Sequence, residues 1–268
     1  MDLEDKARWV RQQVLEMVTR AGKGHIGGSF SCVEILVSLY YDGILHYNPQ
    51  KPDWEDRDIF ILSKGHACCA LYPILADVGY FPLSELDAYC QEGSIFEAHA
   101  NGAIPGIELT TGSLGQGLGI GAGWALAAKL DDRRNRIYVL LGDGECYEGS
   151  VWEAANFAAH HKLNNLIAIV DRNQQCVLDF TENCNKLEPF IDKWVAFGWN
   201  VVQIDGHNFN AIKNALYWIV CIDRPLVVIA NTTKGKGVSF MERNLEYHHK
   251  IPTKQEYELG QKELSNGY

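Results

Sequence analysis

The segment Ile137-Tyr-Val-Leu-Leu-Gly-Asp143-Gly-Glu145 indicates the fold most clearly, together with a second segment one helix later, Leu166-Ile-Ala-Ile-Val-Asp171-Arg-Asn173. Each is an apolar run of the length of one buried strand, followed at once by polar residues. Parallel strands joined through one helix end side by side at one edge of a sheet. We therefore expect Asp143 and Asn173 to lie close together at the carboxyl edge of a parallel sheet.

The side chains at these two strand ends suit a hard metal ion. Taken separately, Gly-Asp-Gly is an ordinary turn and Asp-Arg-Asn an ordinary strand-end loop. Together, a carboxylate and a carboxamide oxygen are ligands for Mg²⁺ or Ca²⁺, and we expect a backbone carbonyl near Gln175 as the third. Because Mg²⁺ keeps few protein ligands and usually shares its shell with phosphate, a diphosphate cofactor is the expected partner.

The rest of the chain alternates predicted helices and strands, which indicates one doubly wound α/β domain over residues 1–268 with a mostly parallel central sheet. Residues 22–28 read as a glycine-rich loop, and Ser31–Glu34 and Ser150–Glu153 as capping boxes. The charged tail from about Leu245 shows no core signal. The predicted helices cover 3–20, 31–41, 151–162, 208–222 and a glycine-spaced stretch ending near Leu130, and the remaining strands cover 59–62, 201–204 and 226–230.

Composition excludes several classes of function. The net charge of −10 argues against nucleic-acid binding, although a local cluster of His and Lys can still hold an anionic substrate. No apolar run is long enough to span a membrane, and the charged N-terminus is not a signal peptide. The eight cysteines form no CxxC pair, which indicates reduced, buried thiols in a cytoplasmic protein.

The segment Leu109-Thr-Thr-Gly-Ser-Leu-Gly-Gln-Gly117-Leu-Gly119 has two interpretations. Hydroxyl groups and glycines at the start of a helix let backbone N–H groups approach an anion. Glycines at helical spacing also permit close packing, with Gly115, Gly119 and Gly123 on one face and Gly117 and Gly121 on another. Gly117-x-Gly119-x-x-Ala122 also fits a dinucleotide fingerprint, but weakly, since no convincing strand precedes it.

Histidines and glutamates supply further candidates. His25, His66, His99 and His248 stand in or near glycine-rich loops. Loop histidines are usually surface residues, but convergence on the edge that carries Asp143 would give several donors for a polyhydroxylated anion. Glu148 has no evident structural role and could carry protons or lie in a subunit interface.

The motifs GKGHIGG, LSKGHA, TTGSLGQGLG, GDGECYEGSVWEA, the DRN strand end and TTKGKGVSFMERNLEYHH together resemble a known family. The chain resembles the N-terminal, thiamine diphosphate-binding half of transketolase, in the form in which the enzyme is split into two subunits. The resemblance runs from about residue 5 to residue 252.

The resemblance implies thiamine diphosphate held through Mg²⁺, with Ca²⁺ or Mn²⁺ as substitutes. The metal ligands would be Asp143, Asn173 and the carbonyl of Gln175. His25, His66, His99 and His248 would face the ketose donor, with His66 and His248 also near the cofactor. Glu148 would belong to a dimer-interface carboxylate network, with Glu153 a second member. The other cofactor contacts would be Gly112, Ser113, Leu114, Gly144 and Glu145.

Two departures from the family concern the donor pocket. The family usually has His-Pro where this chain has His25-Ile26 and His99-Ala100, and the loop from His99 to Pro105 is one residue shorter. We therefore expect a donor pocket of a different shape.

The implied activity is transfer of a two-carbon ketol unit from a ketose to an aldose, and it requires a partner. A C-terminal-half subunit would supply the pyrimidine-binding domain and its activating Glu, in a heterotetramer. The sugar could belong to the pentose phosphates or to a dedicated pathway for branched or sulfonated sugars. The alternatives are a deoxyxylulose-phosphate synthase, a dehydrogenase E1 component, a nicotinamide oxidoreductase and a non-enzymatic subunit. The TTKGKGVSFME segment argues against the first two.

Overall fold

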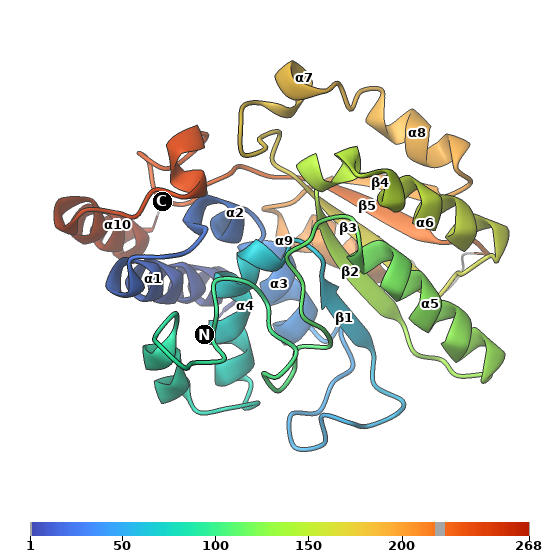
Figure 1. The fold of residues 1–268 in the computed structure, drawn as a ribbon, viewed down its shortest axis with the longest axis horizontal. Coiled ribbons are helices and arrows are strands. Elements are labelled where there is room, and N and C mark those ends of the chain that lie inside the picture. Colours follow the sequence, from blue (N-terminus) through green and yellow to red (C-terminus); the bar gives the residue numbers. More distant parts are fainter. Residues whose placement is uncertain (1, 218–222, 268) are drawn as a thin grey trace.

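A computed structural model describes residues 2–217 and 223–267. Its centre is a five-stranded sheet in the order β1-β2-β3-β5-β4, and every neighbouring pair of strands is parallel (Figure 1). This confirms the predicted α/β class and parallel sheet, while the extent of a single domain stays a prediction. The strands are β1 (Ile59–Leu62), β2 (Ile137–Gly142), β3 (Leu166–Arg172), β4 (Asn200–Asp205) and β5 (Leu226–Asn231).

Helices cover both faces of the sheet, as the apolar strands require. On β2, Tyr138 and Leu140 pack into one core, and Val139 and Leu141 into the other. The first core is shared with α1 (Leu3–Ala21), α3 (Val33–Tyr41), α4 (Cys68–Asp77) and α9 (Phe209–Tyr217), and the second with α5 (Gly117–Leu130), α6 (Gly149–His160) and α8 (Phe190–Ala196) (Figure 1). None of the described helices is both long and apolar enough to cross a membrane.

The register of the sheet brings the two decisive segments together. β2 and β3 are direct neighbours, with Gly142 paired to Asp171. Asp143 therefore leaves the sheet beside the end of β3, and Asn173 follows that end. The predicted adjacency of the two strand ends is confirmed.

The segment around residues 22–34 differs from its prediction. Ile26–Ser31 forms a short helix, α2, so only the first part of the glycine-rich stretch is a loop. Ser31 is no N-cap: its hydroxyl donates to the carbonyl of Gly28 at 3.1 Å and to Asp171 at 2.5 Å. The predicted capping box is wrong because tertiary partners, Arg11 in the case of Glu34, take both side chains.

The second predicted capping box is also wrong. Helix α6 begins at Gly149 with Glu148 as its N-cap residue, and no side chain caps it. Ser150 lies inside the first turn and donates to the carbonyl of Gly115 at 2.9 Å, while Glu153 is exposed. The hydrogen bond of Ser150 to the loop at Gly115 thus takes the place of the predicted capping bond within the helix.

The C-terminal segment belongs to the core, contrary to expectation. Tyr247 and Leu264 are buried, and helix α10 (Lys254–Asn266) packs against α1. Its apolar residues are spaced widely among charges, which is why the sequence pattern concealed them. The predicted helix over 208–222 is described as α9 up to Tyr217, and its end lies outside the described residues.

Candidate functional site

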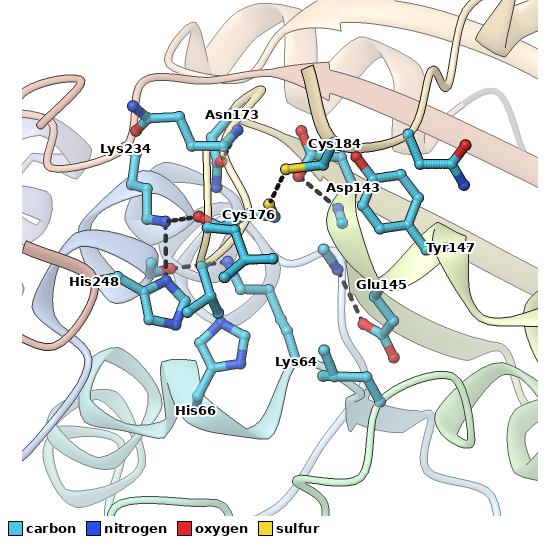
Figure 2. Close-up of a pocket in the computed structure, with 18 residues that line it drawn as sticks. Lys64, His66, Asp143, Glu145, Tyr147, Asn173, Cys176, Cys184, Lys234 and His248 are labelled. Atoms are coloured by element: carbon cyan, nitrogen blue, oxygen red, sulfur yellow. Dashed lines mark hydrogen bonds between the residues drawn. The ribbon is translucent and has the colours of Figure 1, made fainter. Parts of the chain in front are cut away.

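A pocket of about 360 Å³ lies at the carboxyl ends of β2 and β3 (Figure 2). Of the predicted site residues, His66, Leu114, Asp143, Gly144, Glu145, Asn173, Gln175 and His248 line it. Lys64, Tyr147, Cys176 and Lys234 are among the lining residues that the sequence pattern did not indicate. The pocket therefore lies at the ends of the two strands, where the sequence placed Asp143 and Asn173.

The three predicted metal-ligand residues are buried, and they lie close to one another in the folded chain. One carboxylate oxygen of Asp143 accepts from the backbone N–H of Gln174 at 2.6 Å and from Arg172 at 3.2 Å. Asn173 directs its carboxamide oxygen to the N–H of Gln175 at 3.0 Å. The hairpin after β3 uses the carbonyl of Gln174 and the N–H of Cys176, and so leaves the carbonyl of Gln175 outside its ladder.

Asp143 carries an electrostatic cost that a cation would relieve. Burial raises the pKa of Asp143 to about 6, even though Arg172 acts to lower it. A carboxylate whose charge is poorly solvated gains more than an exposed one when a divalent cation binds beside it. Lone pairs from Asp143, Asn173 and the Gln175 carbonyl therefore fit a hard cation.

Two buried lysines place positive charge in the same pocket. Lys64 forms an ion pair with Asp171, in which both side chains are almost fully buried, and it also donates to the carbonyl of Gly28 at 2.8 Å. Lys234 donates to the carbonyl of Cys176 at 3.1 Å and contacts His248 Nδ1 at 2.9 Å. Among the described residues, no carboxylate lies within ion-pair distance of Lys234, and burial lowers its pKa to about 8.

The ammonium group of Lys234 suits an anionic ligand. A buried ammonium without a carboxylate partner is costly unless a ligand supplies the missing negative charge. Figure 2 shows Lys234 and Lys64 reaching into the pocket from different segments, with Asn173 and Asp143 on its upper side. The pocket thus combines cation ligands with buried cationic groups, which is the donor set of a metal–diphosphate site.

The predicted histidines converge. The ring of His25 lies 5.4 Å from that of His66, 5.1 Å from His99 and 5.6 Å from His248, measured between ring centroids. His249, which the sequence pattern did not indicate, lies 4.8 Å from His25. Gly112 packs close to His99, since a Cβ at Gly112 would lie 3.2 Å from the ring of His99.

The four predicted histidines are held neutral near pH 7. Burial, followed by the charges of His99 and His249, lowers the pKa of His25 to about 4. Burial and the nearby Lys234 lower the pKa of His248 to about 3, and burial also lowers the pKa values of His66 and His99. Neutral imidazoles present one donor and one acceptor each, which suits hydroxyl-rich ligands.

Other predicted residues have structural partners or remain at the periphery. Glu145 accepts from Ser63, from the N–H of Gly115 at 2.9 Å and from the N–H of Gly142 at 3.0 Å, so its carboxylate ties loops together. Ser113 and Glu148 are exposed, and neither lines the pocket. The N–H of Gly115 is thus used by Glu145 and does not remain available for an anion.

The thiols are less uniformly buried than predicted. Cys32, Cys68, Cys69 and Cys146 are buried, but Cys184 is exposed. Cys176 and Cys184 both line the pocket, with their sulfur atoms 3.3 Å apart (Figure 2). The loop after β3 brings these thiols to the pocket rim, which no spacing in the sequence indicates.

The site residues that sequence reasoning missed are chiefly Lys64, Lys234, Asp171 and His249. Lys64 precedes Gly65-His66, and Lys234 lies in Thr232-Thr-Lys-Gly235, so both stand in segments with distinctive motifs. Asp171 merely flanks the strand end in the sequence. No local pattern could indicate that its carboxylate pairs with a lysine from the end of β1.

The chain matches the family described as transketolase, thiamine diphosphate binding domain, over residues 4–264. It therefore belongs to the transketolase family of transferases and comprises that family's thiamine diphosphate-binding part. This confirms the resemblance seen in the motifs.

Similar proteins include chains that are named as subunits of transketolases. The chain is 42% identical to one subunit of the apulose-4-phosphate transketolase of Phocaeicola vulgatus, over 98% of this chain and 94% of that protein. It is also 42% identical to one subunit of the 6-deoxy-6-sulfo-D-fructose transketolase of a Clostridium species, over 98% and 96%. Human transketolase is 36% identical, and the match covers 92% of this chain but only 40% of the human protein.

Solved structures agree with this assignment. The transketolase of Campylobacter jejuni superposes with a TM-score of 0.93 at 30% identity, over 99% of this chain and 43% of the other. The transketolase of Leishmania mexicana gives 0.91 at 28% identity, over 99% and 41%. The fold is therefore that of part of a full-length transketolase.

Proposed function

We propose that the chain is the cofactor-binding subunit of a two-subunit, Mg²⁺-dependent transketolase. The observation that carries this proposal is the pocket at the ends of β2 and β3. It unites the oxygen donors of Asp143 and Asn173 with the ammonium of Lys234 and with neutral histidines.

The residues of the pocket fit the two parts of a metal–diphosphate group. Asp143, Asn173 and the backbone carbonyl of Gln175 would hold Mg²⁺. Lys234 would offset the charge of the diphosphate, with His66 and His248 beside it. Support comes from the burial of the Lys234 ammonium without a carboxylate partner among the described residues, and from the raised pKa of Asp143.

When bound, thiamine diphosphate supplies the nucleophilic centre needed to cleave the ketose carbon–carbon bond. The protein's part is to bind, orient and transfer protons. His25, His66, His99 and His248 can each accept a proton at one ring nitrogen and donate one at the other. Because burial keeps these imidazoles neutral, they can hold sugar hydroxyls at pH 7 without adding positive charge.

A partner protein is part of the proposal. The relatives matched over nearly their full length are named as subunits, while full-length transketolases are matched over 40%. We infer that a C-terminal-half subunit completes the active site and that the assembly is a heterotetramer. Glu148 is exposed at the start of α6, which supports its place in an interface, and Glu153 is exposed on the same helix.

The proposed donor is a ketose that carries a phosphate or a sulfonate. The names of the two similar subunits specify apulose 4-phosphate and 6-deoxy-6-sulfo-D-fructose. We infer a cytoplasmic location for the reaction, which the free thiols of the described residues support.

The test replaces Asp143 by Ala and by Asn in the complex with the partner subunit. We expect at least a hundredfold loss of activity at a fixed low Mg²⁺ concentration, and a similar weakening of thiamine diphosphate binding measured by calorimetry. The carboxylate is lost in both variants, whereas Asn keeps the shape of the side chain.

The matched control is Asp131→Ala, at the exposed end of α5 away from the pocket. It should bind the cofactor like the unaltered chain. Retention of cofactor binding and activity by Asp143→Ala would show that the metal assignment is wrong. A chain that binds no Mg²⁺–thiamine diphosphate with its partner present would be a non-enzymatic subunit.

A further inference from the structure

Three histidine rings bring one nitrogen atom each close together. One ring nitrogen each from His25, His248 and His249 lies within 4.8 Å of the others. His25 is buried, His248 is partly buried and His249 is exposed. Such spacing is typical of a transition-metal site, and also of a point at which one polar group is bound from several sides.

The contact of His248 with Lys234 assigns its proton. The ammonium of Lys234 lies 2.9 Å from Nδ1 of His248. If that ammonium donates, Nδ1 is the acceptor and the proton of the neutral ring is on Nε2. Nε2 then has no lone pair for a metal ion and acts as a hydrogen-bond donor.

His25 presents the complementary group. Its Nδ1 is buried and has no hydrogen-bond partner among the described residues. Nδ1 is therefore open to a ligand, and in the neutral ring with its proton on Nε2 it is an acceptor.

An acceptor next to a donor selects for a hydroxyl group. A hydroxyl between the two rings can donate to a ring nitrogen of His25 that carries a lone pair and accept from Nε2 of His248 at the same time. A cation would instead meet the nearby positive charge of Lys234, with only one free lone pair from these two rings. The geometry favours a sugar hydroxyl over a metal ion.

His249 is the third histidine of this group. Its ring lies 4.4 Å from that of His248 and 4.8 Å from that of His25. The backbone at His249 is fixed, because its N–H donates to the carbonyl of Glu246 and the nearby Tyr247 is buried. No side-chain hydrogen bond holds the His249 ring within the described part of the chain, so its nitrogens remain available to a ligand.

We propose that His249 is a specificity-determining residue, which binds a hydroxyl of the ketose donor held between His25 and His248. This inference rests on the proposed function. It assigns to this chain a share in donor selection beyond the anchoring of the cofactor.

The experiment uses the complex with its partner, loaded with Mg²⁺ and thiamine diphosphate, and compares His249→Ala with His249→Asn. The donors are D-xylulose 5-phosphate, D-fructose 6-phosphate and 6-deoxy-6-sulfo-D-fructose. For the donors turned over, we expect KM to rise about 3- to 10-fold in the Ala variant, the effect of one hydrogen bond. Asn should recover part of this loss, because it keeps a donor and an acceptor.

Three controls distinguish donor binding by His249 from effects on cofactor binding, on general stability and on metal binding. The dissociation constant of thiamine diphosphate should stay within about twofold, since His249 does not line the cofactor pocket. His160→Ala removes an exposed histidine at the end of α6 and should leave KM unchanged. Titration of the untagged chain with ZnCl₂ should show no binding that depends on His249.

The inference is overturned if KM is unchanged in His249→Ala for all donors, or if cofactor binding weakens in parallel. Zinc binding that disappears in His249→Ala would replace the hydroxyl site by a metal site. Failure of the unaltered complex to bind Mg²⁺–thiamine diphosphate would overturn the proposed function itself, and is distinguished because it is seen with His249 intact.

Discussion

At the residue scale, the site is defined by how each buried charge is compensated. Lys64 and Asp171 neutralise each other, and Ser31 and Thr232 add hydrogen bonds to the same carboxylate. That pair is complete without a ligand. Lys234 has only a carbonyl and an imidazole as partners among the described residues, so it is the ammonium group that an anionic cofactor would complete.

Replacement of Lys234 by Met, which keeps the length and apolar character of the stem, tests this difference. We expect thiamine diphosphate to bind about 10- to 100-fold more weakly, because a charge-assisted hydrogen bond to a phosphate is lost. Calorimetric titration at fixed Mg²⁺ concentration measures the effect. Lys254→Met, at an 89% exposed side chain on α10, is the control and should bind normally. Equal affinities of the two variants would contradict the role of Lys234.

At the element scale, the contact of α5 with β2 fixes the second core beneath the site. A Cβ at Gly121 would lie 2.6 Å from a methyl group of Val139, whereas a Cβ at Gly123 would meet nothing within 4 Å. The predicted close packing of glycines is thus required on the face of Gly117 and Gly121. The face of Gly119 and Gly123 has room for side chains. No strand precedes α5 directly in the described chain, so the dinucleotide fingerprint lacks its context.

The two glycines predict opposite effects of the same substitution. Gly121→Ala should lower the free energy of unfolding by ~1–3 kcal/mol, because the stiff Val139 side chain must shift. Gly123→Ala should leave it unchanged or raise it by up to ~1 kcal/mol, because alanine favours a helix. Urea unfolding of the two variants, followed by circular dichroism, compares them directly. A less stable Gly123→Ala variant would show that this helix face is already packed.

At the scale of the whole molecule, one buried ionic network joins segments far apart in the sequence. Arg11 from α1 binds both carboxylate oxygens of Glu34 from α3, at 2.7 and 2.8 Å. His207, after β4, contacts Glu34 at 2.9 Å and accepts from the N–H of Thr233 at 2.8 Å. The network therefore positions the loop that carries Lys234 against the N-terminal helices.

This network predicts an acid-dependent loss of stability. Burial alone would raise the pKa of Glu34, but Arg11 and His207 outweigh it and hold the pKa at about 2, below the ordinary value of 4.5. A lowered folded-state pKa stabilises the protein above about pH 4.5, and that contribution is lost as the pH falls towards 2. At neutral pH, Glu34→Gln should lower the free energy of unfolding by ~3 kcal/mol, since Arg11 is left without its carboxylate.

Denaturant unfolding at a series of pH values between 2 and 7 checks this expectation. The difference between the unaltered chain and Glu34→Gln should be largest near neutrality and should shrink below about pH 4.5. The exposed Glu258→Gln change on α10 serves as control and should follow the unaltered chain. A constant difference at all pH values would mean that the Glu34 charge does not stabilise the fold.

The parallel sheet, the adjacency of β2 and β3, and the place of Asp143 and Asn173 at their ends could all be predicted from the sequence. These features follow from apolar runs and from the geometry of parallel strands, both of which are local or nearly so. The motif resemblance added the cofactor and the family. It also indicated the histidines. Their spacing in the sequence alone could not establish that they converge.

Which side chains contact one another became evident only in the folded chain. Ser31, Glu34 and Ser150 carried local capping signals, yet partners distant in sequence took each of them. The burial of Tyr247, the convergence of His249 on His25 and the isolation of the Lys234 ammonium also depend on contacts between segments far apart in the chain. Packing and charge compensation act through space, and for this reason the pattern along the chain could not reveal them.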